Sequence, residues 1–359
     1  MAAQHGAREL PLVRVDAYNA ELQDPMGEGF LGDRASNRAF VAILEDWRER
    51  VRRGADGEDP LDEALGGERA THEIHRRELD GVLQAADEDP EAAGLVHSAI
   101  EDFAQEMAAV VRRFLRLPAW LGTERIAVGG GFLEARVGLM AIGRVGVLLK
   151  AGGEAVRMVP VSRHPDAAAL CGVAHLVEPE VLRGYDAMIA ADIGGTNMRA
   201  GLVALGLEVA PDLARARVAA AERWRHAGKE VSRDEAVARL AAMLGALAER
   251  SSWEGLRLAP VVGVGCPGVI LADGTIERGG QNLPGGGWEG SGFNLLERLA
   301  AALPPVGGAR PSMIMHNDAV VQGLSELPAM RDVERWGALT IGTGLGNACF
   351  TNRRRRDGT

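Results

Sequence analysis

The chain has 359 residues, of which 47% are hydrophobic and 25% are charged. This length suits two domains of ordinary size, and this balance is typical of a globular protein rather than a disordered one. The formal net charge of -10 argues against nucleic acid as the main partner. Aromatic residues make up only 4%, so we expect cores built from alanine, valine, leucine and isoleucine.

Signals for secretion or membrane insertion are missing from the sequence. No apolar run approaches the roughly 20 residues of a membrane span, and the start "MAAQHGAREL" has no apolar leader. Cys171, Cys266 and Cys349 lack the spacing of a disulfide framework or a metal site. We therefore expect a cytoplasmic protein with no membrane partner. The one basic cluster, Arg353–Arg356, is interpreted as a solvated tail.

The first third of the chain is predicted to be helical after an irregular start over residues 1–35. Helices are predicted over Asn37–Arg53, Glu73–Ala86 and Pro90–Leu115, because apolar residues recur there at three- and four-residue spacing. The intervening residues 52–70 are predicted to form a polar loop.

Strands and helices alternate in the remainder. Strands are predicted over 125–132, 155–162, 258–270 and 312–318, and strand hairpins over 188–203 and 338–351. Helices are predicted over 136–150, 165–177, 232–250, 293–303 and 319–327. This alternation indicates an α/β protein.

Two predicted hairpins share one design at their turns. The first turn contains Asp192, Gly194, Gly195, Thr196 and Asn197, and the second contains Gly342, Thr343, Gly344 and Gly346. Glycine lets backbone N–H groups approach an anion, and the threonine hydroxyl adds a donor. An acid at such a turn can hold a magnesium ion, which prefers oxygen ligands. A single glycine-rich turn is more often structural, but two of them suggest a site for a phosphate chain.

A third motif, His316-Asn317-Asp318, closes an apolar strand ahead of a helix. Carboxylates at the carboxyl ends of strands open into the cleft of α/β sheets. Asp318 could accept a proton from a substrate hydroxyl while Asn317 binds another hydroxyl. The alternative is that Asp318 only caps the helix that begins at Ala319.

A fourth motif is the glycine-rich stretch "GVGCPGVILADGTIERGGQNLPGGGWEG". Gly265, Pro267 and Gly268 are predicted to shape a turn, while Asn282 and the loop to Trp288 could offer amides and a ring to a sugar. The alternative is an ordinary glycine-rich connection.

Together, these four motifs resemble in order the front half of the ROK family. This family includes bacterial glucokinases, fructokinases, amino-sugar kinases and sugar-responsive repressors. The resemblance covers roughly residues 188–350 and implies an actin-like, hexokinase-type (ribonuclease H-like) ATPase fold of two domains. It implies that ATP phosphates and Mg²⁺ are held by Asp192, Gly194, Gly195, Thr196, Asn197, Gly342, Thr343 and Gly344, with Asp192 toward the metal. It further implies Asp318 as the general base, and a sugar site at Asn282, Asn317, Gly265, Pro267 and Gly268.

The back half of that family resembles residues 29–177, which stand before the front half. "GFLGDRAS" is similar to the close of the family's zinc segment, and "RIAVGGGF" is similar to its adenosine turn, so Gly129, Gly130 and Gly131 would face the nucleotide. "DAAALCGVAHLV" is similar to its closing helix. The resemblance therefore implies a circular permutation. The implied domains are a large domain over 1–177, a linker over 178–187, a small domain over 188–311, and a return to the large domain over 312–359.

The sequence departs from the family at its metal and sugar ligands. The zinc cysteines are absent, the Glu-x-Gly-His motif has no counterpart, and Gly32 stands where the zinc segment usually has a glutamate. We expect no structural zinc, and we interpret His72 and His75 as residues of a solvated helix face. The resemblance implies an ATP-dependent kinase for a hexose or amino sugar. The alternative is a sugar- or nucleotide-sensing protein of the same fold with little catalysis. The sequence does not decide whether the protein is a monomer or a homodimer.

Overall fold

The contacts within a computed structural model of the chain, which describes residues 4–25, 27, 29–54 and 57–353, divide it into two compact units. The first unit comprises Met1–Ala20, Val161–Ala338 and Gly346–Thr359. The second comprises Glu21–Pro160 and Leu339–Leu345. The predicted tail residues Arg354–Arg356 lie outside the described residues.

The bounds of these two units differ from the bounds of the domains that the sequence predicted. Residues 161–177 belong with the first unit because α6 (Pro165–Gly172) packs on strands β4, β5 and β6 of that unit. The predicted linker at 178–187 and the predicted boundary near 311 both lie inside the first unit.

A five-stranded mixed sheet with the order β10-β7-β4-β5-β6 forms the centre of the first unit. Its strands are β4 (Ala187–Ile193), β5 (Asn197–Ala204), β6 (Arg217–Arg225), β7 (Leu258–Cys266) and β10 (Ser312–Asn317). Strands β4, β7 and β10 run parallel, whereas β5 is antiparallel to both β4 and β6. The parallel strands therefore end at the same edge of the sheet.

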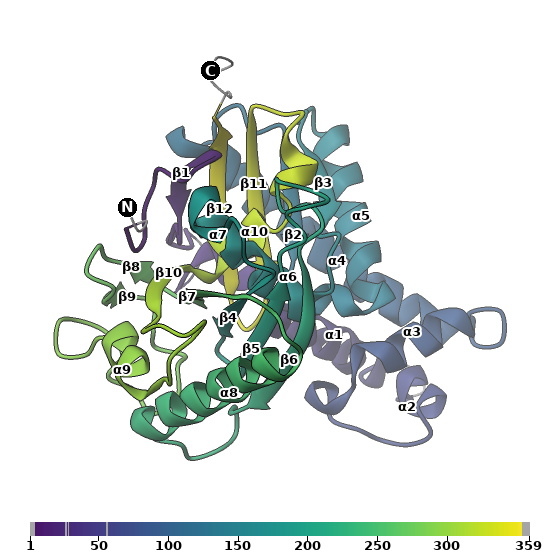
Figure 1. Ribbon diagram of the computed structural model, residues 1–359. Helices are drawn as coiled ribbons and strands as arrows, with labels where there is room; N and C mark the ends of the chain where they lie inside the picture. The colour runs from purple at the N-terminus through teal and green to yellow at the C-terminus, as the bar shows by residue number, and fades with distance from the viewer. Residues whose placement is uncertain (1–3, 26, 28, 55–56, 354–359) are drawn as a thin grey trace. The chain divides into compact units, whose positions relative to one another are not determined.

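Alternation along β4 gives the sheet two apolar faces. Ala187, Ile189, Ala191 and Ile193 join one core with α8 (Arg233–Trp253) and α9 (Leu295–Ala302). The opposite face is covered by α6 and by the 3₁₀ turn η5 (Val173–Leu176), which approach so closely that Gly201 and Gly263 have no room for a side chain. Figure 1 shows α8 running along these strands. Because side chains alternate in a strand, Asp192 lies on the α6 face.

The remaining elements of the first unit are short. They are α7 (Pro179–Leu182), α10 (Asp318–Leu324), η6 (Leu327–Met330), and the two-stranded sheet of β8 (Val269–Ile270) and β9 (Ile276–Arg278). Helix α8 begins with a capping box in which Ser232 and Glu235 satisfy each other's backbone N–H groups.

Strand β1 (Val13–Tyr18) corrects the prediction that residues 1–35 are irregular. It pairs antiparallel with β12 (Leu345–Asn352), and the side chains of Val13 and Val15 are buried. The strand is too short for its alternation to stand out among the turn-forming residues around it. Its pairing with β12, which is remote in sequence, decides its conformation.

A second five-stranded sheet has the order β1-β12-β11-β2-β3. Strands β11 (Arg335–Ile341) and β12 each pass from one unit to the other. In the second unit the end of β11 lies beside β2 (Arg125–Gly129), and β2 pairs parallel with β3 (Arg157–Pro160). The second unit is thus α/β, as the first is, and the predicted class is confirmed.

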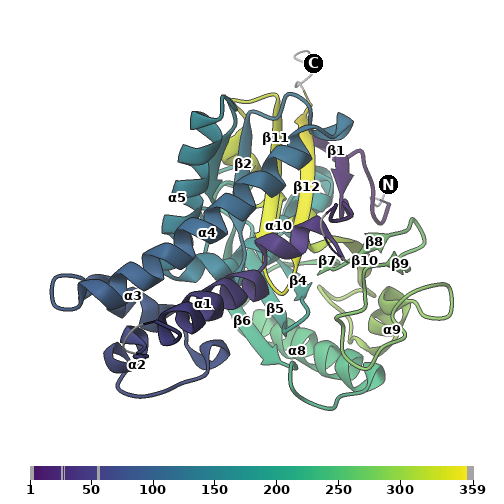
Figure 2. The same ribbon diagram turned by 180° about the vertical axis from the view of Figure 1, so that it is seen from behind.

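Helices form most of the second unit. They are α1 (Asn37–Arg52), α2 (Pro60–Ala64), α3 (Arg76–Gln84), α4 (Pro90–Leu115) and α5 (Arg136–Ala151), with the 3₁₀ turns η1 (Leu31–Ala35), η2 (Thr71–Glu73), η3 (Pro118–Trp120) and η4 (Gly131–Glu134). Helix α4 packs against α5 and α1, as Figure 2 shows. Phe40 and Phe103 make edge-to-face contact where α1 meets α4. Helix α5 has no cap of its own, and Asp80 of α3 accepts hydrogen bonds from the first two N–H groups of α5.

Helix α2 corrects the predicted polar loop over 52–70. The fully buried Arg48 of α1 donates hydrogen bonds to Asp59 and Asp62. Asp59 directly precedes helix α2, and Asp62 lies in its first turn. Asp59 also accepts a hydrogen bond from the backbone N–H of Leu61, a side chain that is itself buried. A charged side chain inside the protein needs such partners, so the acidic residues that made the segment look like a loop are the ones that order it.

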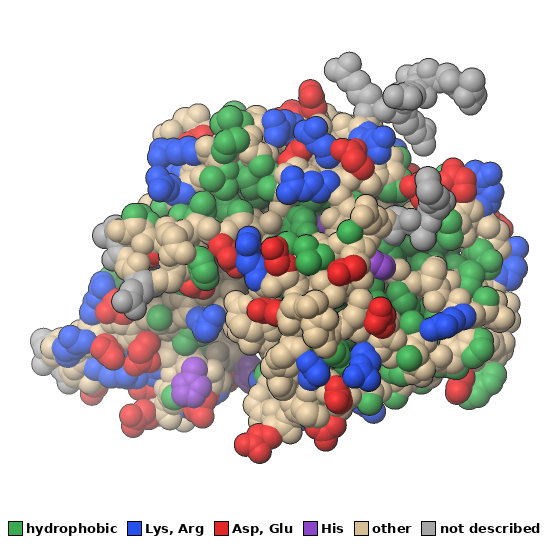
Figure 3. Space-filling view, turned by 90° about the vertical axis from the view of Figure 1, so that its left-hand side faces the viewer, with side chains coloured by type: hydrophobic (Ala, Val, Ile, Leu, Met, Phe, Trp, Pro, Cys, Tyr) green, Lys and Arg blue, Asp and Glu red, His purple; other side chains and the backbone are tan. Residues whose placement is uncertain are grey.

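The charged side chains are spread over the surface in view in Figure 3, where acidic and basic groups are interspersed. Among the described residues, no helix combines the length and the apolar run that crossing a membrane would require.

Substituting Gly172→Ala tests the packing of α6 on α10. An added methyl group would lie 1.7 Å from the carbonyl oxygen of Val321, so we expect the free energy of unfolding to fall by about 3 kcal/mol. Gly245→Ala in α8 is the matched control, because its methyl group would meet Pro304 only at 3.6 Å. It should raise stability by about 0.5–1 kcal/mol. Urea unfolding of both variants measures the difference, and equal effects would contradict the packing.

Candidate functional site

Polar side chains gather where the three parallel strands of the first unit end. In register, Asp192 of β4 is the neighbour of Gly265 of β7, and Gly265 is the neighbour of His316 of β10. One position further on, Cys266 is the neighbour of Asn317. The sheet therefore brings the predicted residues Asp192, Gly265 and Asn317 to one edge, and Asp318 follows directly.

Asp192 is a buried carboxylate with one cationic partner. Its side chain is 11% exposed, and its Oδ2 accepts a hydrogen bond of 3.1 Å from Nη1 of Arg199. Burial raises the pKa of Asp192, and the charge of Arg199 opposes that rise. The other oxygen, Oδ1, lies toward Gly265, where a side chain would stand only 3.5 Å from it. The same side chain would also meet Cγ2 of Val321 at 2.7 Å, so position 265 favours glycine.

The turn between β4 and β5 carries the predicted residues Gly194, Gly195, Thr196 and Asn197. The N–H of Gly194 donates to the carbonyl of Asn197, which closes the turn. The carbonyls point toward the end of β6: Nε2 of His226 lies 2.8 Å from the oxygen of Gly194, and the N–H of His226 donates to the oxygen of Thr196. A turn whose carbonyl oxygens are already bound can present N–H groups to an anion.

Asn317 and Asp318 both accept hydrogen bonds from backbone N–H groups at the start of α10, but to different extents. The Oδ1 of Asn317 accepts hydrogen bonds from the N–H groups of Ala319 and Val320, so Asn317 is the main helix cap. Its Nδ2 donates to the carbonyl of Gly268 at 3.0 Å. Asp318, whose Oδ1 lies 2.9 Å from the N–H of Ala319, is half-buried. Its cap role is secondary, which leaves the carboxylate available for chemistry.

The environment of Asp318 favours its protonated form. Burial, followed by the negative charge of Asp192, raises the pKa of Asp318 to about 6. The neighbouring His316 has its pKa lowered to about 4 by burial. His316 packs edge-to-face on Tyr18 and lies 3.1 Å from the carbonyl of Ala7, so it is a neutral structural residue.

The glycine-rich loop places its predicted residues unequally. Gly268 and Gly279 face each other with backbone φ angles of 96° and 90°, and no side chain would fit at either position. Asn282 is exposed on the next turn. Trp288 does not offer its ring to a ligand, because it is 1% exposed and packs on Phe293. Its indole N–H donates to the carbonyl of Pro284, which makes it the anchor of the loop.

Asn19 is a polar residue near this loop that the sequence did not single out. Its backbone φ is 49°, and hydrogen bonds from the N–H groups of Asn19 and Ala20 to Asn347 hold that conformation. The Nδ2 atom of Asn19 is buried without a hydrogen-bond partner in the described part of the chain. It lies 3.3 Å from the point where a side chain of Gly279 would begin.

Cysteines and histidines of the described residues do not assemble into a metal site. Cys171, Cys266 and Cys349 are buried cysteines outside any disulfide. His72 lies in η2 and His75 immediately precedes α3, and both are exposed. Within the described ranges, no group of three or more His, Cys, Asp or Glu side chains is arranged to hold a metal ion.

The second unit contains the other predicted hairpin. Gly342, Thr343 and Gly344 form the turn between β11 and β12, which the N–H of Gly342 closes by donating to the carbonyl of Gly344. The start of α1 holds this turn. The N–H of Asn37 donates to the oxygen of Gly342, and Nε of Arg38 donates to the oxygen of Thr343 at 3.0 Å.

The predicted adenosine turn adjoins this hairpin within the same unit. Gly130 has a φ of 95°, and a side chain there would lie 2.3 Å from the carbonyl oxygen of Ile341, the residue before Gly342. Only glycine allows this approach. Arg76 donates to the carbonyl of Gly131 and to Oδ1 of Asn37, so it ties the two turns to the start of α1. Gly129 is the last residue of β2.

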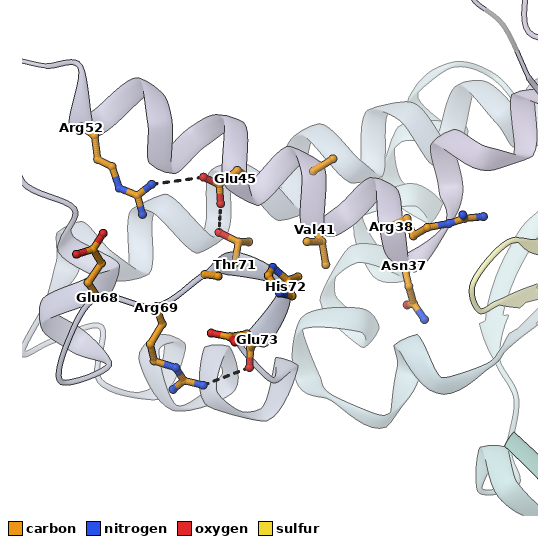
Figure 4. A pocket seen from close by; sticks show the side chains of 12 residues that line it. Asn37, Arg38, Val41, Glu45, Arg52, Glu68, Arg69, Thr71, His72 and Glu73 are labelled. Atoms are coloured by element: carbon orange, nitrogen blue, oxygen red, sulfur yellow. Dashed lines mark hydrogen bonds and ion pairs between the residues drawn. The ribbon is translucent and has the colours of Figure 1, made fainter. Parts of the chain in front are cut away.

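A pocket of about 910 Å³ begins at this point and extends along α1 (Figure 4). It is lined by Asn37, Arg38, Val41, Ala42, Glu45, Arg52 and residues 68–73. Figure 4 shows Glu45 joined to Arg52 and Thr71, and Val41 facing the segment of Thr71 and His72. Arg38 and Glu45 are seven positions apart on the helix, which corresponds to a rise of about 10 Å.

Sequence reasoning missed residues that act through remote partners. Arg199 could have been found, since it follows Asn197 by two residues on the same face of a strand. His226, Asn37, Arg38 and Arg76 have no such signal, because their partners come from distant parts of the chain.

No family model and no curated protein matches this chain. Solved structures with a partial likeness include a candidate sugar kinase of Cytophaga hutchinsonii ATCC 33406, with a TM-score of 0.35 and 21% identity over 46% of this chain and 48% of that one. A candidate N-acetylmannosamine kinase of Listeria monocytogenes has a TM-score of 0.34 and 25% identity over 46% of this chain and 47% of that one. The chain thus spans about half the length of each of these two structures. At these TM-scores the likeness carries no weight, and any function must be argued from the site itself.

Proposed function

We propose that this protein transfers the γ-phosphoryl group of ATP to a hydroxyl of a hexose or amino sugar. The observation that carries the proposal is Asp318, a half-buried carboxylate whose pKa is raised to about 6, at the same sheet edge as the buried Asp192. A general base is most effective when its pKa is near the working pH. Two acids whose surroundings differ in this way can take different roles.

Asp318 serves as the base in this proposal. The sugar hydroxyl oxygen forms a bond to the γ-phosphorus, the bond from phosphorus to the ADP oxygen breaks, and the hydroxyl proton passes to the Asp318 carboxylate. Asn317 positions Asp318 by capping α10. Its Nδ2, bound to Gly268, links the base to the loop of Gly265, Pro267, Gly268 and Asn282, which would hold the sugar.

Asp192 and the first turn serve the phosphate side. The chemistry of Asp192 suits Mg²⁺, because Mg²⁺ prefers oxygen ligands and Arg199 bonds only Oδ2 of the two carboxylate oxygens. When bound, Mg²⁺ would offset the charge of the phosphate oxygens. The N–H groups of Gly194, Gly195, Thr196 and Asn197 would bind phosphate oxygens at the same turn.

The second unit carries a further set of groups that we propose for nucleotide binding. The turn of Gly342, Thr343 and Gly344 offers N–H groups for phosphates, and the pocket along α1 begins beside it. The length of that pocket suits a nucleoside, whose base would lie toward Glu45. Gly129, Gly130 and Gly131 would border the nucleotide from β2.

We further propose that the chain contains a hexokinase-type fold in permuted order, with large-domain segments over 1–177 and 312–359 and a small domain over 188–311. These proposed domains have other bounds than the two contact units. The neighbouring positions of β2 and β11 support this order, since the two strands are remote in sequence. The close approach of Gly130 to Ile341 belongs to the same strand neighbourhood.

Asp318→Asn should lower kcat by roughly a hundredfold or more, because the amide cannot take the hydroxyl proton. Sugar affinity should change little, since the amide has the same shape. ADP release measured over a panel of hexoses and amino sugars tests this, beside calorimetric sugar binding.

Asp186→Asn is the control for that substitution, because Asp186 precedes β4 at the opposite end from Asp192 and pairs with Arg257. It should leave kcat unchanged. An Asp318→Asn variant as active as the parent would falsify the assignment of the base. Sugar binding without any turnover in the parent would favour the sensing alternative.

The raised pKa of Asp318 also predicts a pH-dependent stability. A folded-state pKa of about 6, above the ordinary 3.8, means that the folded protein binds a proton more tightly than the unfolded chain. The Asp318 contribution therefore becomes less favourable as the pH rises from about 4 through 6. Asp318→Asn should raise the melting temperature at pH 7 in EDTA, and the gain should shrink toward pH 4. A gain that is constant with pH would argue against the raised pKa.

Val41→Trp should block the pocket beside the second hairpin. A bulky ring there should weaken ADP binding at least tenfold, or by about 1.4 kcal/mol, without changing sugar affinity. Val147→Trp is the matched control, because Val147 is 55% exposed on α5 of the same unit. Calorimetric titration with ADP measures both variants. Unchanged affinity in Val41→Trp would place the nucleoside elsewhere.

A further inference from the structure

Asp192, Arg199 and Arg223 form a row across three strands of the first sheet. Asp192 is in register with Arg199, and Arg199 is in register with Arg223. Cross-strand neighbours lie on the same face of a sheet, and here that face is covered by α6. Two arginines directly opposite each other repel, so the row requires a compensating anion.

Asp166, in the first turn of α6, supplies that anion. Its Oδ1 accepts a hydrogen bond of 2.6 Å from Nε of Arg199, and its Oδ2 accepts one of 3.2 Å from Nη1 of Arg223. The Arg199 side chain is only 17% exposed, whereas that of Arg223 is 58% exposed. The buried arginine therefore has two carboxylate partners, Asp166 and Asp192.

Different nitrogen atoms of the Arg199 guanidinium bind these two carboxylates. Nε points to Asp166, and Nη1 alone reaches Asp192, on Oδ2. A free arginine prefers a two-point contact with a carboxylate, which at Asp192 would engage both oxygens. Asp166 prevents such a two-point contact with Asp192, because it accepts the hydrogen bond from Nε of Arg199. As a result, Arg199 leaves Oδ1 of Asp192, the oxygen on the side of Gly265, without a hydrogen bond from its guanidinium.

We propose that Asp166 is a positioning residue which restrains Arg199, so that Asp192 keeps one carboxylate oxygen for a divalent cation. This inference rests on the proposed function, in which Asp192 holds Mg²⁺. Without Asp166, Arg199 turns onto Asp192 and competes with the cation. Asp166 touches neither the cation nor the substrates.

The test measures divalent-cation binding directly, with Mn²⁺ as the probe. Electron paramagnetic resonance counts free Mn²⁺ in the presence of ADP, and kinetics give the Mg²⁺ dependence of turnover. Asp166→Asn should weaken Mn²⁺ binding roughly tenfold and raise the Mg²⁺ requirement by a similar factor, with the KM for sugar unchanged. Arg223→Gln, which loses only the exposed contact, should match the parent.

A double-mutant cycle shows whether Asp166 acts through Arg199. In an Arg199→Gln background, the added Asp166→Asn should have no further effect on Mn²⁺ binding. A tenfold loss that persists in that background overturns the proposal, as does a lower melting temperature of Asp166→Asn with unchanged Mn²⁺ affinity. Absence of Mn²⁺ binding to the parent also overturns it. If the parent binds Mn²⁺ with ADP but phosphorylates no sugar, the proposed function fails, while the binding cycle still decides the role of Asp166.

Discussion

The need to compensate a buried carboxylate at Asp192 governs the arrangement around the candidate site. Ionised carboxylates inside a protein are costly unless they are paired. Asp192 obtains Arg199 from the next strand, and Arg199 is held in turn by Asp166 from α6. The packing of α6 on the sheet is therefore part of the electrostatics of the site. Gly201 and Gly263 permit that close packing. These strand glycines therefore help to place Asp166 beside Arg199 as well as to pack the core.

The same compensation is absent around Asp318. Burial and the charge of Asp192 raise its pKa, and among the described residues the opposing groups are hydrogen-bond donors rather than arginine or lysine side chains. Asp192 thus makes its neighbour a stronger proton acceptor by its own negative charge. Neutralisation of Asp192 by a bound cation would lower the pKa of Asp318 again. The two acids are consequently coupled, so a change of charge at Asp192 changes the pKa of Asp318.

Local patterns predicted most regular elements of the chain. Helix α4 begins and ends where Pro90 and the apolar stripe to Leu115 indicate, because its caps and its spacing are both local. Strand β1 and helix α2 could not be predicted in this way, since β1 depends on pairing with β12 and α2 depends on the buried Arg48. The expected α/β class held because it depends only on the alternation of elements.

The candidate site was predictable where motifs follow strands and unpredictable where side chains meet across the sheet. Asp192 and Asp318 could be named from their positions at strand ends. The interpretation of Trp288 as a sugar-facing ring was wrong, since a large aromatic ring gains more by burial against Phe293 than by exposure in a loop. Asn19 illustrates the remaining difficulty. Its buried amide is placed beside Gly279 by hydrogen bonds to Asn347, almost the full length of the chain away. A polar group whose position depends on such a distant partner becomes visible only when the chain is folded.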